Sequence, residues 1–307
     1  MLLTTLIWGI NYPVVKYTLT DLIPINFAAL RFLFGTIVMV PFALAAKQRL
    51  SIPRSDLLRI AALGFLANVC YQSLFVYGMK LSTAGDAAIM LATAPIFTAI
   101  IGRVRRQEFF GIQAVIGLVL AFAGISILVS FSGAGRKAGD PANHVAGNCI
   151  LLCAAVCWAS YTVGIKRFSH QYGSIKATTL MMLTGTPMLI IVSVPSLLRQ
   201  DWHSVRTASW AGVAYSAVFS IAIAYIIWSY GVHRIGPTRT SIYSNITPIA
   251  TWLAAWPLLG ETPLPGQIVG AVIILAGVYL VRQGMTLAPA AGDPIEFEIE
   301  EETVRPG

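Results

Sequence analysis

Ten apolar stretches, each near the length that a helix needs to cross a lipid bilayer, constrain this chain of 307 residues more than any other feature. A helical span takes about 20 apolar residues. The breaks between the stretches are short and hold charged residues, glycine and proline. We predict membrane-spanning helices over residues 1–18, 23–46, 57–78, 84–102, 111–130, 146–165, 177–198, 211–232, 240–259 and 266–281.

The composition is typical of a membrane protein. Apolar residues make up 56% of the chain and charged residues only 11%, with a mean hydropathy of +0.73, whereas soluble domains carry about a quarter charged residues. The stretches lack the alternation of apolar and polar residues that a transmembrane barrel needs, and backbone groups in lipid must then be bonded within helices. The predicted fold is all-α, a polytopic membrane protein with ten transmembrane helices.

The net charge is +8, which in a soluble protein would suggest nucleic acid as a partner. Here the basic residues fall in short loops beside the predicted helices, with more of them on one side, and the positive-inside rule explains this bias. We expect no nucleic-acid partner, a bacterial inner (plasma) membrane location, and cytoplasmic N- and C-termini. The first stretch has neither a basic segment nor a small-residue cleavage site, so we expect it to be retained.

The sequence also repeats itself. WGINYPVVK at residues 8–16 is matched by WASYTVGIK at residues 158–166. Each copy covers five predicted helices, and an odd number of spans inserts the second copy upside down. We predict two inverted five-helix repeats, over residues 1–131 and 145–285. An offset of 153 aligns Tyr77 with Tyr230, Pro95 with Pro248, Glu108 with Glu261, Gly117 with Gly270 and Gly124 with Gly277.

Three stretches carry a resemblance to a known family: WGINYPVVK followed by ALRFLFG, then APIFTAI, then YSNITPIATWLAAWPLLGETPLPGQIVGAVIILAGVYL. On these stretches the chain resembles the EamA-type branch of the drug/metabolite transporter superfamily. The resemblance implies ten helices, transport of small metabolites, and a central cavity built from both halves. It implies no particular substrate, because members carry amino acids, nucleosides, sugars or drugs. The chain departs from the pattern between Arg103 and Glu108, where arginines replace an apolar helix end.

Side chains at mid-depth of the predicted helices are candidate substrate-binding residues. Arg31 is the only basic residue well inside an apolar stretch. It could bind a substrate carboxylate with two hydrogen bonds, or tie its helix to backbone carbonyls or reach outward to water. Pro95 and Pro248 are predicted helix breaks that free a carbonyl to face a cavity. The other candidates, for which packing between helices is the alternative, are Asn11, Tyr12, Tyr71, Gln72, Thr93, Trp158, Tyr161, Tyr225, Trp228, Tyr243 and Asn245.

Acidic residues and histidines lie in loops, at helix ends or in the tail, apart from Asp86, which enters a span. Proton-coupled carriers use a relay of buried acids or histidines. We therefore expect facilitated diffusion or exchange. Proton coupling through Asp86 at the rim of its span is the alternative.

Other functional classes find less support. Cys149, Cys153 and Cys157 share one face of a predicted helix, but no histidine at a matching depth completes a metal site, and close packing of small residues explains them. An intramembrane enzyme needs a nucleophile with an acid/base partner or a phosphate loop, which the sequence lacks. A helical scaffold would not require an inverted repeat. We expect no cofactor, no metal, no catalytic residue and a monomer.

The sequence thus predicts a secondary transporter that exports small metabolites by alternating access, with the lipid bilayer and a small-molecule substrate as partners. The cavity is expected to form largely between the third, fourth, eighth and ninth helices. Its aromatic candidates favour hydrophobic or aromatic amino acids. A proton-coupled carrier of drugs, nucleosides or sugars is the alternative. Residues 286–307, rich in acids and proline, are predicted to be a disordered cytoplasmic tail.

Overall fold

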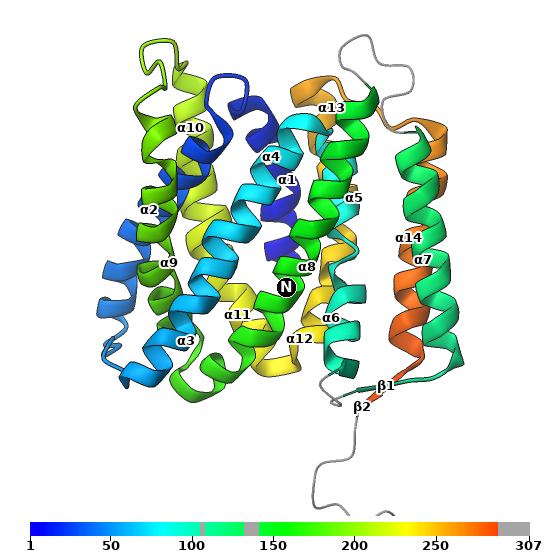
Figure 1. Ribbon diagram of the computed structural model, residues 1–307, viewed down its shortest axis with the longest axis horizontal. Helices are drawn as coiled ribbons and strands as arrows, with labels where there is room; N and C mark the ends of the chain where they lie inside the picture. Colours follow the sequence, from blue (N-terminus) through cyan, green and yellow to red (C-terminus); the bar gives the residue numbers. More distant parts are fainter. Residues whose placement is uncertain (105–107, 132–140, 288–307) are drawn as a thin grey trace, which may run out of the picture.

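The computed structural model describes residues 1–104, 108–131 and 141–287 as a bundle of helices with one pair of short strands (Figure 1). In the first half the helices are α1 (Leu2–Thr18), α2 (Pro24–Ala45), α3 (Arg54–Gly64), α4 (Gln72–Leu81), α5 (Ala84–Leu91), α6 (Ala94–Val104) and α7 (Ile112–Phe131). In the second half they are α8 (Pro141–Tyr172), α9 (Ser174–Leu197), α10 (Thr207–Tyr215), α11 (Ala224–Ile235), α12 (Pro237–Ser241), α13 (Thr247–Leu259) and α14 (Pro265–Gln283).

Segments of altered winding join some of these helices into longer rods. The π-helical segment η1 (Phe65–Tyr71) connects α3 to α4, and the π-helical segment η2 (Ser216–Ile223) connects α10 to α11. The 3₁₀ segment η3 (Ile242–Ile246) connects α12 to α13. Each of the ten predicted stretches therefore falls on helix, and the described residues form an all-helical bundle apart from two short strands.

Six helical rods are long and apolar enough to cross a membrane by length and composition, within the described residues. They are Pro24–Ala45, Arg54–Leu81, Ala84–Val104, Ala142–Tyr172, Ser174–Leu197 and Thr207–Ile235. Shorter apolar helices cover Ile112–Leu128 and Pro265–Val281. Sharp reversals between rods use glycine: Gly173 and Gly236 have φ values of 80° and 84°, which side chains with a Cβ rarely adopt.

Two short strands were not expected from the sequence. β1 (Glu108–Phe110) pairs antiparallel with β2 (Met285–Leu287), and Phe109 lies opposite Thr286 in the register. The predicted boundary of the tail at residue 286 is therefore wrong by two residues, because these residues pair with the segment that follows α6. Residues 288–307, the rest of the predicted tail, lie outside the described residues, as do Arg105, Arg106 and residues 132–140, which fall between the two predicted repeats.

Helices α7 and α14 stand together at one side of the bundle (Figure 1). The two helices contact one another at glycines. A Cβ on Gly117 would come within 2.6 Å of the Gly277 carbonyl oxygen, and a Cβ on Gly124 within 2.8 Å of the Gly270 carbonyl oxygen. Small residues let helix backbones approach closely in a membrane, where packing contacts replace the hydrophobic effect. Glycine at these positions thus sets the distance between the two helices.

At each end of the bundle, a cluster of hydrogen bonds to one carboxylate, here called a clasp, joins segments far apart in the chain. In the turn between α1 and α2, the Asp21 carboxylate accepts hydrogen bonds from the Arg206 guanidinium at 2.8 Å and from the Ser209 hydroxyl at 2.6 Å. At the other end, the Asp56 carboxylate accepts from Gln171 at 3.0 Å and from Tyr172 at 2.5 Å. Each clasp joins the first half of the chain to the second.

The Asp21 clasp predicts a dependence of stability on pH. The hydrogen bond from Arg206 holds the pKa of Asp21 well below its ordinary value, so its contribution is complete above an unfolded-state pKa of about 4 and is lost as the pH falls toward the folded-state pKa. Asp21→Asn should lower the midpoint temperature of unfolding in detergent at pH 7, and the difference should shrink below about pH 4. An equal difference at all pH values would contradict this assignment.

Candidate functional site

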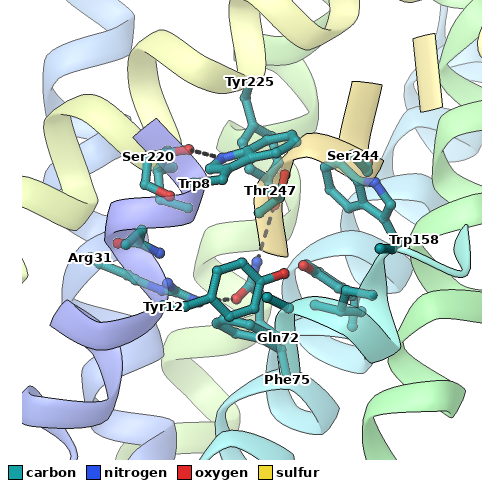
Figure 2. Close-up of a pocket in the computed structure, with 16 residues that line it drawn as sticks. Trp8, Tyr12, Arg31, Gln72, Phe75, Trp158, Ser220, Tyr225, Ser244 and Thr247 are labelled. Atoms are coloured by element: carbon teal, nitrogen blue, oxygen red, sulfur yellow. Dashed lines mark hydrogen bonds between the residues drawn. The ribbon is translucent and has the colours of Figure 1, made fainter. Parts of the chain in front are cut away.

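The middle of the bundle holds a cavity (Figure 2). Its walls come from both halves of the chain and combine aromatic rings with a few polar groups. They are Trp8, Asn11, Tyr12, Arg31, Tyr71, Gln72, Phe75, Ala88, Leu91, Ala92, Trp158, Ser220, Ile221, Tyr225, Ser244 and Thr247.

Irregular winding places several of these side chains. Tyr71 ends the π-helical segment η1, and Ser220 and Ile221 belong to η2; a π-helical turn often marks a functional site. The rod of α5 and α6 is interrupted between Leu91 and Ala94, just before Pro95. The second interruption is the 3₁₀ segment η3, which precedes α13 and Pro248. Both prolines thus follow a helix break that borders the cavity.

Arg31 lies on the cavity wall with only 2% of its surface exposed. Its guanidinium donates to the Gln72 side-chain oxygen, and the Gln72 amide nitrogen donates to the Tyr225 hydroxyl at 3.1 Å (Figure 2). The guanidinium carbon also lies 4.9 Å from the Phe27 ring centre and 5.2 Å from that of Phe75. These contacts fix the plane of a cation inside the bundle.

The Arg31 guanidinium still has donor capacity to spare. Within the described part of the chain, no acceptor bonds its Nε, which is buried. A buried donor left unpaired costs about 1–3 kcal/mol, and a carboxylate that accepted from it would recover that cost with a charge-assisted bond. The Thr247 hydroxyl, also on the cavity wall, is likewise buried and unpaired among the described residues.

An aromatic cluster forms another wall. The ring centre of Trp158 lies 5.3 Å from that of Trp8, 5.0 Å from that of Tyr71 and 5.5 Å from that of Tyr225. Trp8 donates its indole N–H to the Ser220 carbonyl at 3.0 Å. These rings offer apolar faces to the cavity while hydrogen bonds hold their edges.

The candidates from the sequence divide into two groups. The ones that line the cavity are Asn11, Tyr12, Arg31, Tyr71, Gln72, Trp158 and Tyr225. The others, Thr93, Tyr161, Trp228, Tyr243 and Asn245, do not line it.

Tyr161 and Trp228 lie behind the wall, with ring centres 5.1 Å and 5.4 Å from that of Trp158. The Thr93 hydroxyl is buried and donates to the Met90 carbonyl at 2.6 Å. Tyr243 faces a different groove, beside α1 and α11.

Several lining residues escaped the sequence reasoning. Trp8 was the equivalent of Trp158 in the repeat, and that equivalence could have found it. Thr247 and Ser244 flank the predicted candidates Asn245 and Pro248, but nothing in the sequence tells which face of the segment meets the cavity. The cavity also extends beyond the third, fourth, eighth and ninth predicted helices. Trp8, Arg31 and Trp158 come from α1, α2 and α8, which are the first, second and sixth predicted helices.

Asp86 is buried, with 1% of its surface exposed. It lies in the first turn of α5, and its carboxylate accepts from the Gln267 amide of α14 at 2.7 Å. Glu261 reaches the same helix end and accepts from the Ala84 backbone N–H at 3.0 Å. Carboxylates at a helix N-terminus are stabilised by the helix dipole.

Cys149 and Cys153 are exposed on α8, and Cys157 is half-buried. Their expected role in close helix packing is therefore wrong for the two exposed thiols. No group of three or more metal-binding side chains occurs among the residues described.

Comparison with known proteins identifies the family. Residues 1–130 and 145–283 match the EamA-like transporter family. The chain belongs to this family. It is an integral membrane protein of a transporter family, and both matched segments contribute walls to the cavity.

This EamA-like transporter is similar to proteins of known sequence over nearly its full length. It is 25% identical to the uncharacterized transporter YyaM of Bacillus subtilis, over 92% of this chain and 91% of that one. It is also 25% identical to the probable terminal-alkyne amino-acid exporter of Streptantibioticus cattleyicolor, over 92% of both chains. One solved crystal structure has the same fold, with a TM-score of 0.67 at 17% identity, covering 91% of this chain and 94% of its own.

The hydrogen bonds of Gln72 predict an order of mutational effects. Gln72→Met removes the acceptor of a buried guanidinium and should cost about 2–3 kcal/mol, whereas Tyr225→Phe removes a neutral bond and should cost about 1 kcal/mol. The midpoint of thermal unfolding in detergent measures both, and the double variant measures their coupling. A larger loss for Tyr225→Phe would contradict the geometry.

Proposed function

We propose that this protein is a secondary transporter that exports small amphipathic carboxylates, above all hydrophobic or aromatic amino acids, by alternating access. The observation that carries the proposal is Arg31, a buried guanidinium with an unpaired Nε on the wall of an aromatic cavity. Burying a charge at this depth costs free energy, and charged residues kept inside a membrane span generally serve a function. Export is supported by the relative that is named a probable amino-acid exporter.

The chemistry of the walls fits such a solute part by part. A substrate carboxylate would accept from the guanidinium of Arg31, whose plane Gln72 and the phenylalanine rings hold. A substrate ammonium would find the Thr247 hydroxyl as an acceptor, and ring faces that attract cations. An apolar side chain would lie against Trp8, Trp158 and Tyr71. The cavity thus offers a partner to each end of an amino acid.

Two inverted five-helix repeats are the proposed architecture behind this cavity. An axis of two-fold symmetry makes contacts reciprocal: if one residue meets a second, their counterparts meet too. Gly117 packs on Gly277, and the counterpart of each, Gly270 and Gly124, pack on one another. This reciprocity supports a pseudo-two-fold relation between residues 1–131 and 145–285, and thus a ten-helix fold.

Residues near a two-fold axis must meet their own counterparts, and three such pairs support an axis through the cavity. The Trp8 and Trp158 ring centres are 5.3 Å apart. Gln72 donates to Tyr225, 153 residues along the chain, and the Thr36 and Thr186 hydroxyls are 2.9 Å apart. A midplane site between inverted repeats is the arrangement in which rocking of one half against the other exposes the substrate to alternate sides.

The C-terminal ends of α2, α6, α8 and α11 lie at the lower end of the bundle in Figure 1. Most of the basic residues near helix ends lie in or beside this region, and they are Lys47, Arg49, Arg54, Arg59, Arg103, Lys166, Arg167, Lys176, Arg234 and Arg239. We propose that this end is cytoplasmic in a bacterial inner membrane, with both chain termini on that side.

A panel of labelled amino acids, nucleosides and sugars tests the proposal by counterflow in vesicles without a proton gradient. For an amino acid that is carried, the decisive comparison is with its amide, which lacks the carboxylate. Arg31→Gln should reduce counterflow of the acid by about 10- to 100-fold, the value of a charged hydrogen bond. It should leave the low rate of the amide unchanged.

Two control variants sharpen this test. Arg31→Lys keeps the charge but loses the planar fork, and should recover only part of the acid transport. Arg234→Gln removes an exposed cation outside the cavity and should change nothing. An equal loss for acid and amide in Arg31→Gln would assign Arg31 a structural role and sink the carboxylate proposal.

Proton coupling is the second candidate, because Asp86 is a buried carboxylate two residues from Ala88 on the cavity wall. Facilitated transport or exchange predicts counterflow without a gradient, and an unchanged rate for Asp86→Asn, which keeps the shape that Gln267 contacts. Proton-coupled transport predicts flux only under a pH gradient, and loss of the accompanying proton flux in Asp86→Asn. A pH-sensitive dye inside the vesicles separates the two.

A further inference from the structure

A second concave surface lies between α3 and α8, away from the cavity. Its floor is apolar, formed by Leu63, Val163 and Phe168. Its rim is basic, formed by Arg59, Lys166, Arg167 and His170. We name this surface the basic groove.

The cations of the basic groove exceed their counter-charge among the described residues. Asp56 is the carboxylate that pairs with them, at 3.5 Å from Arg59 and 3.6 Å from Arg167. The same carboxylate also accepts from Gln171 and Tyr172. Arg59 and Arg167 keep 57% and 59% of their side-chain surface exposed, so both guanidinium groups can bind an external anion.

Lys166 on the rim of the basic groove differs in its surroundings from Lys16, its counterpart in the repeat. Lys16, which ends the first motif, donates to the carbonyls of Met79 at 2.8 Å and Lys80 at 3.0 Å, and thus caps the end of α4. Lys166, which ends the second motif, is exposed on the rim of the groove instead. The repeat keeps the lysine, but the second copy presents its charge to the surroundings.

The basic groove lies near the ends of its two helices. Arg59 lies five residues after the start of α3 and Lys166 six residues before the end of α8, which places them about 7–9 Å inside the helix ends. Leu58, next to Arg59, is 73% exposed, so the neighbouring surface is apolar. Phosphate among cations above an apolar floor is the environment of an anionic phospholipid at the membrane interface.

We propose that the basic groove binds one anionic phospholipid, its phosphate among Arg59, Lys166 and Arg167 and its acyl chain along Leu63. Charge complementarity carries the choice of ligand, since a zwitterionic lipid would leave the excess cations unpaired. The proposal does not depend on what the central cavity transports.

Native mass spectrometry of the full chain, titrated with phosphatidylglycerol or phosphatidylcholine, tests this site. The double variant Arg59→Gln, Lys166→Gln should bind its tightest phosphatidylglycerol about 30-fold more weakly, from roughly fivefold for each cation removed. Binding of phosphatidylcholine should not change. Arg167 is kept, because its guanidinium also lies 5.7 Å from the centre of the Phe168 ring and packs on it.

The matched control is Lys47→Gln, Arg49→Gln, which removes two exposed cations from the loop after α2. It should retain the tight phosphatidylglycerol, and so should Lys166→Arg, which keeps the charge. Equal weakening in the control would mean that diffuse charge attracts the lipid, and would overturn the site. Displacement of the lipid by inorganic phosphate at equal concentration would overturn the phospholipid as its ligand.

Discussion

Hydrogen bonds of the backbone govern this fold, because the hydrocarbon core of a membrane offers no water to an unpaired N–H or C=O group. Regular helices satisfy these groups along most of each rod. The winding changes where it can be tolerated: η1, η2, η3 and the interruption before Pro95 all border the central cavity. The irregular segments and the cavity are therefore one feature, since irregular backbone in a bilayer must lie inside the protein.

Close contact between helices then fixes the shape of the bundle. Where glycines meet, as Gly117 meets Gly277, the backbones approach so closely that any larger side chain would move a helix. Elsewhere large rings stand between helices, and Trp8 of α1 and Trp158 of α8 contact one another on the cavity wall. Close contacts at glycines in some places and aromatic rings between helices in others leave space in the middle of the bundle. At its ends, the hydrogen bonds of Asp21 and Asp56 join the two halves of the chain.

Arg31 combines structural and functional demands at one position. Its cation is held by Gln72 and by aromatic rings, so the bundle tolerates it without a carboxylate partner in the structure described. Those contacts leave Nε unpaired. A site that is stable when empty, and gains a strong bond when a carboxylate enters, suits a carrier that must also release its substrate.

The sequence alone determined the helices, their approximate ends and the helix breaks before Pro95 and Pro248, because apolar length and proline act locally. It could not decide which side of each helix meets the cavity. Apolar residues surround most of these helices, since lipid and protein interior are both apolar, and no amphipathic stripe points inward. Tertiary structure therefore decided that Tyr71 lines the cavity while Tyr243 does not, that Asp86 meets Gln267, and that residues 285–287 pair with β1.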